Sequence, residues 1–304
     1  MDDEAYRILR NLELPGINPI SLEVFERNDE ALKIAKTNRS RIEYYFTCTP
    51  SLPLFILNNW PEVDLITYLD ADLFFFQSPE SVFQEMDNAS VGIIGHRFPP
   101  KLKRLELHGI YNVGWLTFRR DDNGINCLNW WRDRCIEWCY DRTEDGRYAD
   151  QKYLDDWPTR FKGVKVIEHK GANLAPWNVD NYRLSPAFEK VLVDDQPLVF
   201  FHFHRTKEVI PNLYTTGLSL YHAKSSSLLR NTLFRPYIKS LIEAESGLAN
   251  HTNQGLKQGI RELNDNPIYS TLARIKSILR LSLGLLLGDY IFVRREKPIR
   301  KQGP

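Results

Sequence analysis

The chain has 304 residues, enough for one large α/β domain or for a domain with an appendage. Hydrophobic residues make up 42% of it and charged residues 26%, as in ordinary globular proteins. Because 40 basic side chains nearly balance 39 acidic ones, the net charge is +1, which argues against nucleic acid as a partner.

The cysteines and the first ten residues indicate the cellular compartment of the protein. The cysteines are Cys48, Cys127, Cys135 and Cys139, with no further Cys or His at zinc-ligand spacing nearby, so we expect reduced thiols. The first ten residues, MDDEAYRILR, are polar and charged and lack the apolar core of a signal peptide. We therefore predict a cytoplasmic protein.

The N-terminal part is predicted to be helical up to residue 59. The expected helices span residues 1–12, 29–43 and 49–59, and a loop with two prolines and a glycine covers residues 11–20. The third of these helices would start with its prolines, which fit the first turn of a helix.

Residues 64–76, DLITYLDADLFFF, hold two aspartates between two apolar runs. The first run predicts a strand over residues 65–69 that is buried on both faces. Asp70 and Asp72 would point the same way if the backbone stays extended. Converging carboxylates repel each other unless a cation or a proton compensates them, and oxygen ligands suit Mg or Mn. The alternative is a solvated turn with two unrelated aspartates.

Helical and strand patterns alternate from there up to residue 168, which predicts an α/β fold. The expected helices begin at Ser78, as the N-cap, and cover residues 126–142 and 148–157, while the strands cover residues 90–95, 109–121 and 164–168. Asn112 and Gly114 interrupt the second strand. They indicate either a structural bulge or close approach by a ligand.

A last strand, residues 197–204, would place His202 and His204 on one face. With Asp70 and Asp72, one of these histidines could hold a cation whose open positions a diphosphate completes. Lys207 or Arg205 could add positive charge to the same oxygens. Asp150 and Gln151, near a helix start, could then bind a sugar.

A boundary is expected near Leu218, with a helical C-terminal extension over residues 218–304. Residues 271–304 carry eight Lys or Arg and two acidic residues around an apolar core, 281–288, that is too short to span a bilayer. This pattern fits peripheral attachment to an anionic membrane surface, and it equally fits a helix that docks on the domain.

Four motifs occur in the order of a known family: YLDADLFFF, YNVGWLTF, DQKYLDDW and FHFHRTK. Over roughly residues 30–210 the chain resembles bacterial GT-A type glycosyltransferases and is similar to the family 8 group, which uses nucleotide sugars with retention of anomeric configuration. The resemblance implies a GT-A-like domain over residues 1–217, a mixed sheet flanked by helices. By the same resemblance Asp70 and Asp72 bind Mn or Mg with His202, or with His204 as the fallback; Lys207 helps to hold the diphosphate; Asn112, Asp150 and Gln151 contact the donor sugar or the acceptor.

The chain departs from the family pattern in two places. His204, Arg205 and Thr206 stand where the last motif of the family continues with glycine and Lys-Pro-Trp. GT-A domains open with a strand, a helix and a strand that hold the nucleobase. This unit has no apparent counterpart here, because residues 1–12 resemble the segment that comes after it.

We expect a glycosyltransferase that moves a hexose from a nucleotide diphosphate sugar to a glycan or glycolipid acceptor, in the cytoplasm or at the inner face of the cell membrane. One alternative is a noncatalytic carbohydrate-binding relative. Another is a haloacid-dehalogenase-type phosphatase, which also places DxD after a buried strand and expects a second acidic pair, partly matched by VLVDD ending at Asp195.

Overall fold

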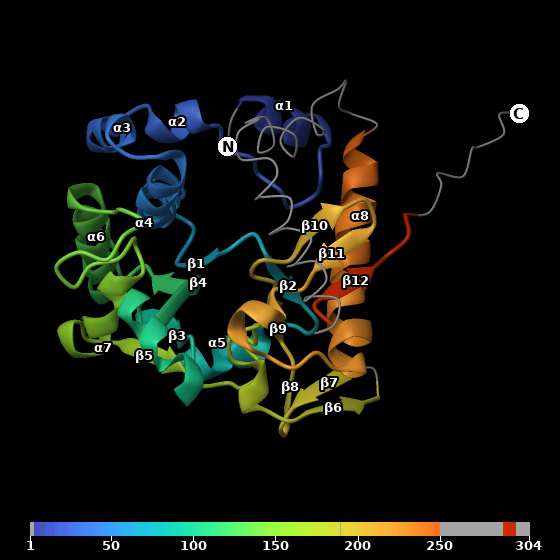
Figure 1. Ribbon diagram of the computed structural model, residues 1–304. Helices are drawn as coiled ribbons and strands as arrows, with labels where there is room; N and C mark the ends of the chain where they lie inside the picture. The colour runs from blue at the N-terminus through green and yellow to red at the C-terminus, as the bar shows by residue number, and fades with distance from the viewer. Residues whose placement is uncertain (1–2, 189, 250–287, 296–304) are drawn as a thin grey trace, which may run out of the picture. The chain divides into compact units, whose positions relative to one another are not determined.

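The computed structural model describes residues 3–188, 190–249 and 288–295, and it divides into two compact units, Met1–His202 and Phe203–Pro304 (Figure 1). The helical segments of the first unit are α1 (Asp3–Asn11), α2 (Leu22–Glu26), α3 (Glu30–Thr37), α4 (Arg41–Asn59), α5 (Glu80–Met86), α6 (Asp122–Glu137), α7 (Trp157–Arg160) and the 3₁₀ segments η1 (Pro100–His108), η2 (Lys152–Asp156) and η3 (Val179–Asn181).

The break between α3 and α4 differs from the predicted helix boundaries. Helix α4 begins after Ser40, whose side chain accepts from the Glu43 N–H while the Glu43 carboxylate accepts from the Ser40 N–H at 2.8 Å. This capping box starts a new helix inside the predicted 29–43 segment. Pro50 and Pro53 consequently lie inside α4, so the predicted helix start at the prolines is wrong.

The central sheet of the first unit is mixed. Its strands are β1 (Leu65–Leu69), β3 (Val91–Gly95), β4 (Tyr111–Arg119) and β5 (Val164–Ile167), in the order β1-β4-β3-β5. Strand β4 is antiparallel to both of its neighbours, and β3 is parallel to β5. The prediction of an α/β fold with a mixed sheet is confirmed at this level.

Strand β1 lies at one edge of this sheet, and the prediction that it is buried on both faces is wrong because none of its residues is fully buried. It pairs with β4 alone among the described strands, and its residues are half-buried, with Leu69 41% exposed. Apolar composition indicated burial, but composition does not reveal which strands have a neighbour on each side. The strands with buried interiors are β3 and β4.

Two apolar cores cover the two faces of the sheet. On one face, α4 and α6 pack on the strands through a core of large side chains: Leu57, Val91, Ile93, Leu116, Phe118, Leu128, Trp131 and Trp157. On the other face, residues of α5 pack with the opposite side of the strands: Val82, Met86, Ile94, Trp115, Ile167 and Phe200. The alternation of Trp115, Leu116 and Phe118 results from the period of two in a strand.

Strand β4 contains the bulge that Asn112 and Gly114 indicated. Its pairing with β3 shifts register between Ile93 and Ile94, which pair with Leu116 and Asn112. Three residues of β4 therefore separate the partners of two adjacent residues of β3. The interpretation as a structural bulge is confirmed, and the shift re-aims the side chain of Asn112.

Short strands complete the first unit. Strands β2 (Leu73–Phe75) and β9 (Phe200–His202) form an antiparallel pair, and β6 (Leu184–Ala187), β7 (Lys190–Val193) and β8 (Gln196–Pro197) form a small sheet. Strand β9 ends at His202, so the alternation argument that placed His202 and His204 on one face does not apply. All four cysteines are free thiols, as predicted.

The second unit contains both helix and sheet. Its elements are β10 (Lys207–Ile210), β11 (Leu213–Thr215), η4 (Leu218–Tyr221), η5 (Leu229–Phe234), α8 (Arg235–Ala249) and β12 (Tyr290–Phe292). Strand β12 pairs with β11, so the region expected to be a purely helical extension supplies a strand. The boundary expected near Leu218 falls inside this unit, and most of residues 271–304 lie outside the described residues. No helix that the structure describes has the length and apolar character needed to cross a membrane.

Candidate metal centre

Asp70 and Asp72 lie in a tight turn between β1 and β2. The N–H of Leu73 donates to the carbonyl of Asp70 at 3.3 Å, which closes the turn, and the N–H of Asp70 donates to the carbonyl of Gly114 at 3.2 Å. The backbone is therefore not extended here, contrary to the assumption behind the predicted convergence. The turn nevertheless brings both carboxylates to one place.

The side chain that both carboxylates face is His202. Strand pairing sets Leu73 opposite His202, and the Nε2 atom of the ring lies 2.9 Å from Oδ1 of Asp72 and 3.7 Å from Oδ2 of Asp70. The His202 side chain is 4% exposed, whereas those of Asp70 and Asp72 are 32% and 39% exposed. Each carboxylate thus lies beside the imidazole at the protein surface, and the ring forms the inner wall of the site.

The electrostatics of this cluster call for a positive charge. Burial raises the pKa of the Asp70 carboxyl, the neighbouring His202 opposes this rise, and the charge of Asp72 adds to it. A neutral Nε2 atom and a carboxylate oxygen at 2.9 Å also repel each other unless a proton or a metal ion lies between them. Two oxygens and one imidazole nitrogen fit a divalent ion such as Mn, with positions left for a ligand.

Tyr68 is a member of the cluster that the sequence interpretation missed. Its hydroxyl donates to Oδ1 of Asp70 at 3.1 Å, and burial together with the charges of Asp70 and Asp150 raises the pKa of the tyrosine. This hydrogen bond fixes one oxygen of Asp70, leaving the other toward His202. The available signal was spacing, because Tyr68 lies in β1 only two residues before Asp70.

Asp150 is buried near the cluster. It is 5% exposed, and its main-chain carbonyl accepts from the indole N–H of Trp131 at 2.8 Å. Burial raises the pKa of the carboxyl to about 7, the hydroxyl of Thr49 opposes the rise, and the charge of Asp70 adds to it. The structure therefore brings Asp150 within electrostatic reach of Asp70.

Gln151 and Asn112 are held by protein groups. The amide of Gln151 donates to the carbonyl of His108 at 3.1 Å. Asn112 is 5% exposed, and its Oδ1 atom lies 3.3 Å from Nδ1 of His202. Asn112 thus lies behind the histidine rather than on the open side of the cluster. Close approach to the bulge does occur, and the His202 ring makes it.

The remaining predicted site residues, His204, Arg205 and Lys207, belong to the second unit. His204 packs near Tyr221, with ring centroids 6.1 Å apart. Arg205 is exposed and has a positive φ of 67°, and Lys207 is exposed at the start of β10, opposite Thr215.

The second acidic pair expected of a phosphatase does not accompany the aspartate turn. Asp194 and Asp195 lie in the turn between β7 and β8, and both carboxylates form ion pairs with Lys170, at 3.2 Å and 3.0 Å. Their charges are therefore neutralised locally by a lysine rather than by a shared cation with Asp70 and Asp72.

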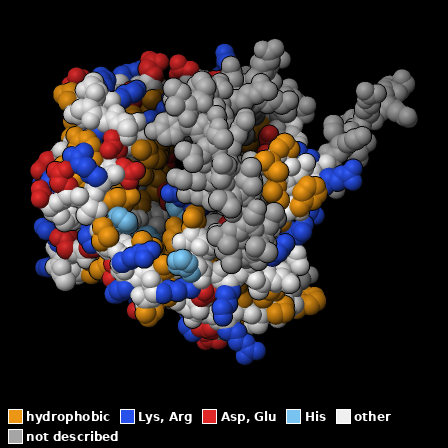
Figure 2. Space-filling view, in the orientation of Figure 1, with side chains coloured by type: hydrophobic (Ala, Val, Ile, Leu, Met, Phe, Trp, Pro, Cys, Tyr) orange, Lys and Arg blue, Asp and Glu red, His pale blue; other side chains and the backbone are white. Residues whose placement is uncertain are grey.

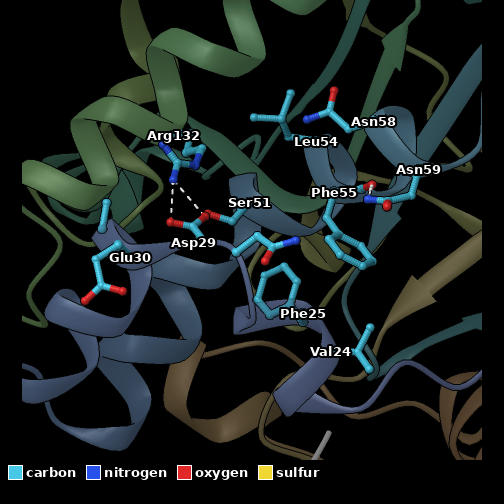
Figure 3. A pocket seen from close by; sticks show the side chains of 12 residues that line it. Val24, Phe25, Asp29, Glu30, Ser51, Leu54, Phe55, Asn58, Asn59 and Arg132 are labelled. Atoms are coloured by element: carbon cyan, nitrogen blue, oxygen red, sulfur yellow. Dashed lines mark hydrogen bonds and ion pairs between the residues drawn. The ribbon is translucent and has the colours of Figure 1, made fainter.

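A separate cavity of about 460 Å³ lies among α2, α3, α4 and α6 (Figure 3). Its wall carries the aromatic rings of Phe25 and Phe55 and the ion pair between Asp29 and Arg132, in which both Asp29 oxygens accept from one guanidinium nitrogen at 2.7 Å. None of the residues of the aspartate turn lines this cavity. On the face shown in Figure 2, acidic and basic side chains are interspersed over the helices α3 and α6.

Fold and site together define an α/β protein with a mixed sheet and a candidate metal centre at the end of its edge strand. Two curated relatives come from Bacillus subtilis (strain 168). The chain is 31% identical over 244 residues to the uncharacterized protein YfnD, covering 79% of this chain and 77% of YfnD. It is 33% identical over 211 residues to the uncharacterized protein YfnF, covering 67% of this chain and 69% of YfnF.

The chain therefore belongs to the family that includes YfnD and YfnF. The names of these two relatives give no activity, and no family model matches the sequence.

Proposed function

We propose that the protein is a metal-dependent glycosyltransferase of the GT-A type, which moves a hexose from a nucleotide diphosphate sugar to a glycan or glycolipid acceptor. The observation that carries this proposal is the convergence of Asp70, Asp72 and His202 at the end of β1. The four motifs that resemble family 8 support the donor class, and retention of configuration is implied by that resemblance.

Some residues of the site are proposed to bind the metal, and others are proposed to bind the diphosphate. Asp70 and Asp72 hold Mn or Mg with His202, and His204 is the alternative imidazole ligand. When bound, the cation would act as a Lewis acid on the leaving diphosphate. Tyr68 orients Asp70 through its hydroxyl. Lys207 and Arg205 are proposed to bind diphosphate oxygens, because fixed positive charge stabilises a leaving group on which negative charge develops.

Asp150 is the residue proposed to meet the sugar. With a pKa of about 7, its carboxyl exists in both protonation states near neutral pH and can donate or accept a hydrogen bond to a hydroxyl group. Gln151 is the next residue in the chain and is proposed to contact donor or acceptor after release from His108. Asn112 was expected in this role as well, but its contact with Nδ1 of His202 favours a different one.

The test is turnover of radiolabelled nucleotide sugars with Mn, preceded by a thermal-shift panel of the same donors. A donor that binds only the folded protein raises its apparent stability, and the rise should require Mn. Asp72→Asn should abolish transfer while leaving the metal-free unfolding temperature within a few degrees of wild type. Full transfer activity in Asp72→Asn would remove the proposal.

The alternatives give different results in the same assays. A noncatalytic carbohydrate-binding relative would show Mn-dependent stabilisation by a sugar without turnover. A phosphatase would release phosphate from p-nitrophenyl phosphate, and the pairing of Asp194 and Asp195 with Lys170 disfavours it. The protein is further proposed to act in the cytoplasm, attached to the inner face of the cell membrane through residues 271–304.

A further inference from the structure

A row of three buried side chains lies behind the candidate metal centre. It runs from the carbonyl of Ile110 through His96 and Asn112 to His202, and the three side chains belong to residues that are 6%, 5% and 3% exposed. Each contact is 3.3 Å between nitrogen or oxygen atoms. The burial matters because nearby water cannot easily replace these bonds.

The amide of Asn112 has only one orientation that satisfies its neighbours. The main-chain N–H of Gly114 can only donate, and it lies 3.2 Å from the Asn112 side chain, so the atom facing it must be the oxygen Oδ1. The same oxygen faces Nδ1 of His202. Because Oδ1 can only accept, Nδ1 of His202 must carry the hydrogen.

The other end of the row agrees with this assignment. With Oδ1 placed, the nitrogen of Asn112 donates to Nε2 of His96. His96 therefore carries its hydrogen on Nδ1, which faces the carbonyl of Ile110, a group that can only accept. The N–H of Gly114 can only donate and the carbonyl of Ile110 can only accept, so these two groups fix the roles at the two ends of the row. Every contact along the row then pairs a donor with an acceptor.

The consequence for His202 is a fixed tautomer. With the hydrogen on Nδ1 bonded to Asn112, a metal ion between the ring and the carboxylates would meet the lone pair of Nε2, the atom that faces Asp72 and Asp70. A metal ion binds an imidazole only through a lone pair, and second-layer hydrogen bonds of this kind set which nitrogen is available.

We infer that Asn112 and His96 are positioning residues that hold His202 in the tautomer that ligates a divalent cation. The inference rests on the proposed metal-dependent function. It gives Asn112 a role in metal binding in place of the sugar contact implied by the family resemblance. Trp177 supports the row by donating its indole N–H to the carbonyl of His96 at 2.9 Å, and its ring packs edge-on against His202.

Three variants test the hydrogen bonds of the row separately. Asn112→Ala removes the acceptor for His202 and the donor to His96. Asn112→Asp keeps an acceptor for His202, replaces the donor to His96 by an oxygen, and adds a negative charge. His96→Phe keeps an aromatic ring against Phe98, which stacks on His96 at 4.6 Å, and leaves the Asn112 amide without its acceptor.

The control is Thr117→Val. It removes a buried hydroxyl on the same strand, which bonds to Thr67 at 3.0 Å, without touching the row. Any effect common to this control and to the Asn112 variants reports general loosening of β4.

The first measurement is the affinity for Mn²⁺, by calorimetry on the full chain. We expect Asn112→Ala to weaken binding by about 10-fold to 100-fold, the usual effect of losing such a partner. Asn112→Asp and Thr117→Val should stay within a few-fold of wild type, and His96→Phe should fall between these limits.

The second measurement is whether Nδ1 of His202 carries a hydrogen in the metal-free protein, from long-range nitrogen-proton NMR correlations. Wild type and Asn112→Asp should show hydrogen on Nδ1, and Asn112→Ala should show a mixture. An Asn112→Ala protein with the wild-type tautomer and wild-type Mn²⁺ affinity would overturn the inference. Wild-type protein that binds no Mn²⁺ would instead defeat the proposed function, because the tautomer readout needs no metal.

Discussion

Gly114 has no side chain, and the ring of His202 lies against the space that a side chain there would need. A Cβ atom on Gly114 would lie 2.9 Å from both Cε1 and Nδ1 of His202, and 2.6 Å from Oδ1 of Asn112. Contacts this short do not occur for real Cβ atoms, so a side chain here would displace the ring or the amide. Glycine is required at this position because β4 and β9 residues approach closely across the bulge.

Gly114→Ala should therefore weaken Mn²⁺ binding by tenfold or more and lower the free energy of unfolding by about 1–3 kcal/mol, the usual cost of overpacking. Calorimetry with Mn²⁺ and urea denaturation measure the two effects. Gly247→Ala is the control, because an added Cβ meets no atom within 4 Å there and the residue lies within α8. That variant should keep its metal affinity and gain up to about 1 kcal/mol. Unchanged affinity in Gly114→Ala would show that His202 does not approach β4 this closely.

Local patterns in the sequence were sufficient for much of this fold. The apolar run before Asp70 predicted β1, and the interruption at Asn112 and Gly114 indicated the bulge of β4 as one of two possibilities. These signals depend on a few neighbouring residues, so they can be read from the chain alone. The start of α4 at the Ser40 capping box is also a local signal, which the two prolines obscured.

The sequence could not supply what depends on pairing between distant segments. That β1 has one strand neighbour, and that Leu73 pairs with His202, are consequences of the whole topology. The convergence of Asp70 and Asp72 is a clear case, because it was predicted from an extended backbone and arises instead from a turn. His96 gave no local sign of its role, since Asn112 reaches it only across the β3–β4 pair.

Asp29 should contribute to stability through three hydrogen bonds at the wall of the cavity in Figure 3. Its Oδ1 accepts from the N–H of Leu32 at 2.9 Å, which caps α3, and both oxygens accept from Arg132 at 2.7 Å. Asp29→Ala loses the cap and leaves the largely buried Arg132 without this partner, so we expect about 2 kcal/mol of destabilisation. Asp29→Asn keeps a cap and should lose about half as much in urea denaturation. If both variants lose the same free energy of unfolding, the charge of Asp29 accounts for the whole effect and the helix cap for none of it.

The proposed membrane attachment can be tested without shortening the chain. Truncation before residue 290 would remove β12, which pairs with β11, so substitution is the sharper test. Replacing Lys297, Arg300 and Lys301 together by Gln should reduce binding to vesicles rich in anionic lipid, since each basic residue near such a surface contributes about 1 kcal/mol. Neutral vesicles are the control. Unchanged binding to anionic vesicles would favour docking of this segment on the protein.

Asp150 should make the stability of the metal-free protein depend on pH. Its folded pKa of about 7 exceeds the ordinary value of 3.8, so between these two values the folded protein retains a proton that the unfolded chain releases. Stability must then fall as pH rises through this window, and the loss should be complete above about pH 7. A shift of this size corresponds to a few kcal/mol, about 4 at most.

Asp150→Asn cannot ionise, so its stability should not fall across the same window. Relative to wild type it should gain stability from pH 5 to pH 8, measured by urea denaturation with a chelator present. Asp133→Asn, at a side chain that is 63% exposed, is the control and should behave as wild type. Asp70→Asn removes one of the charges that raise the pKa of Asp150, so it should lower that pKa and end the fall in stability at a lower pH. If the stability of Asp150→Asn instead changes with pH in parallel with that of wild type, the Asp150 carboxyl is ionised in the folded protein at neutral pH. Asp150 could then not both donate and accept a hydrogen bond to a sugar hydroxyl, as proposed.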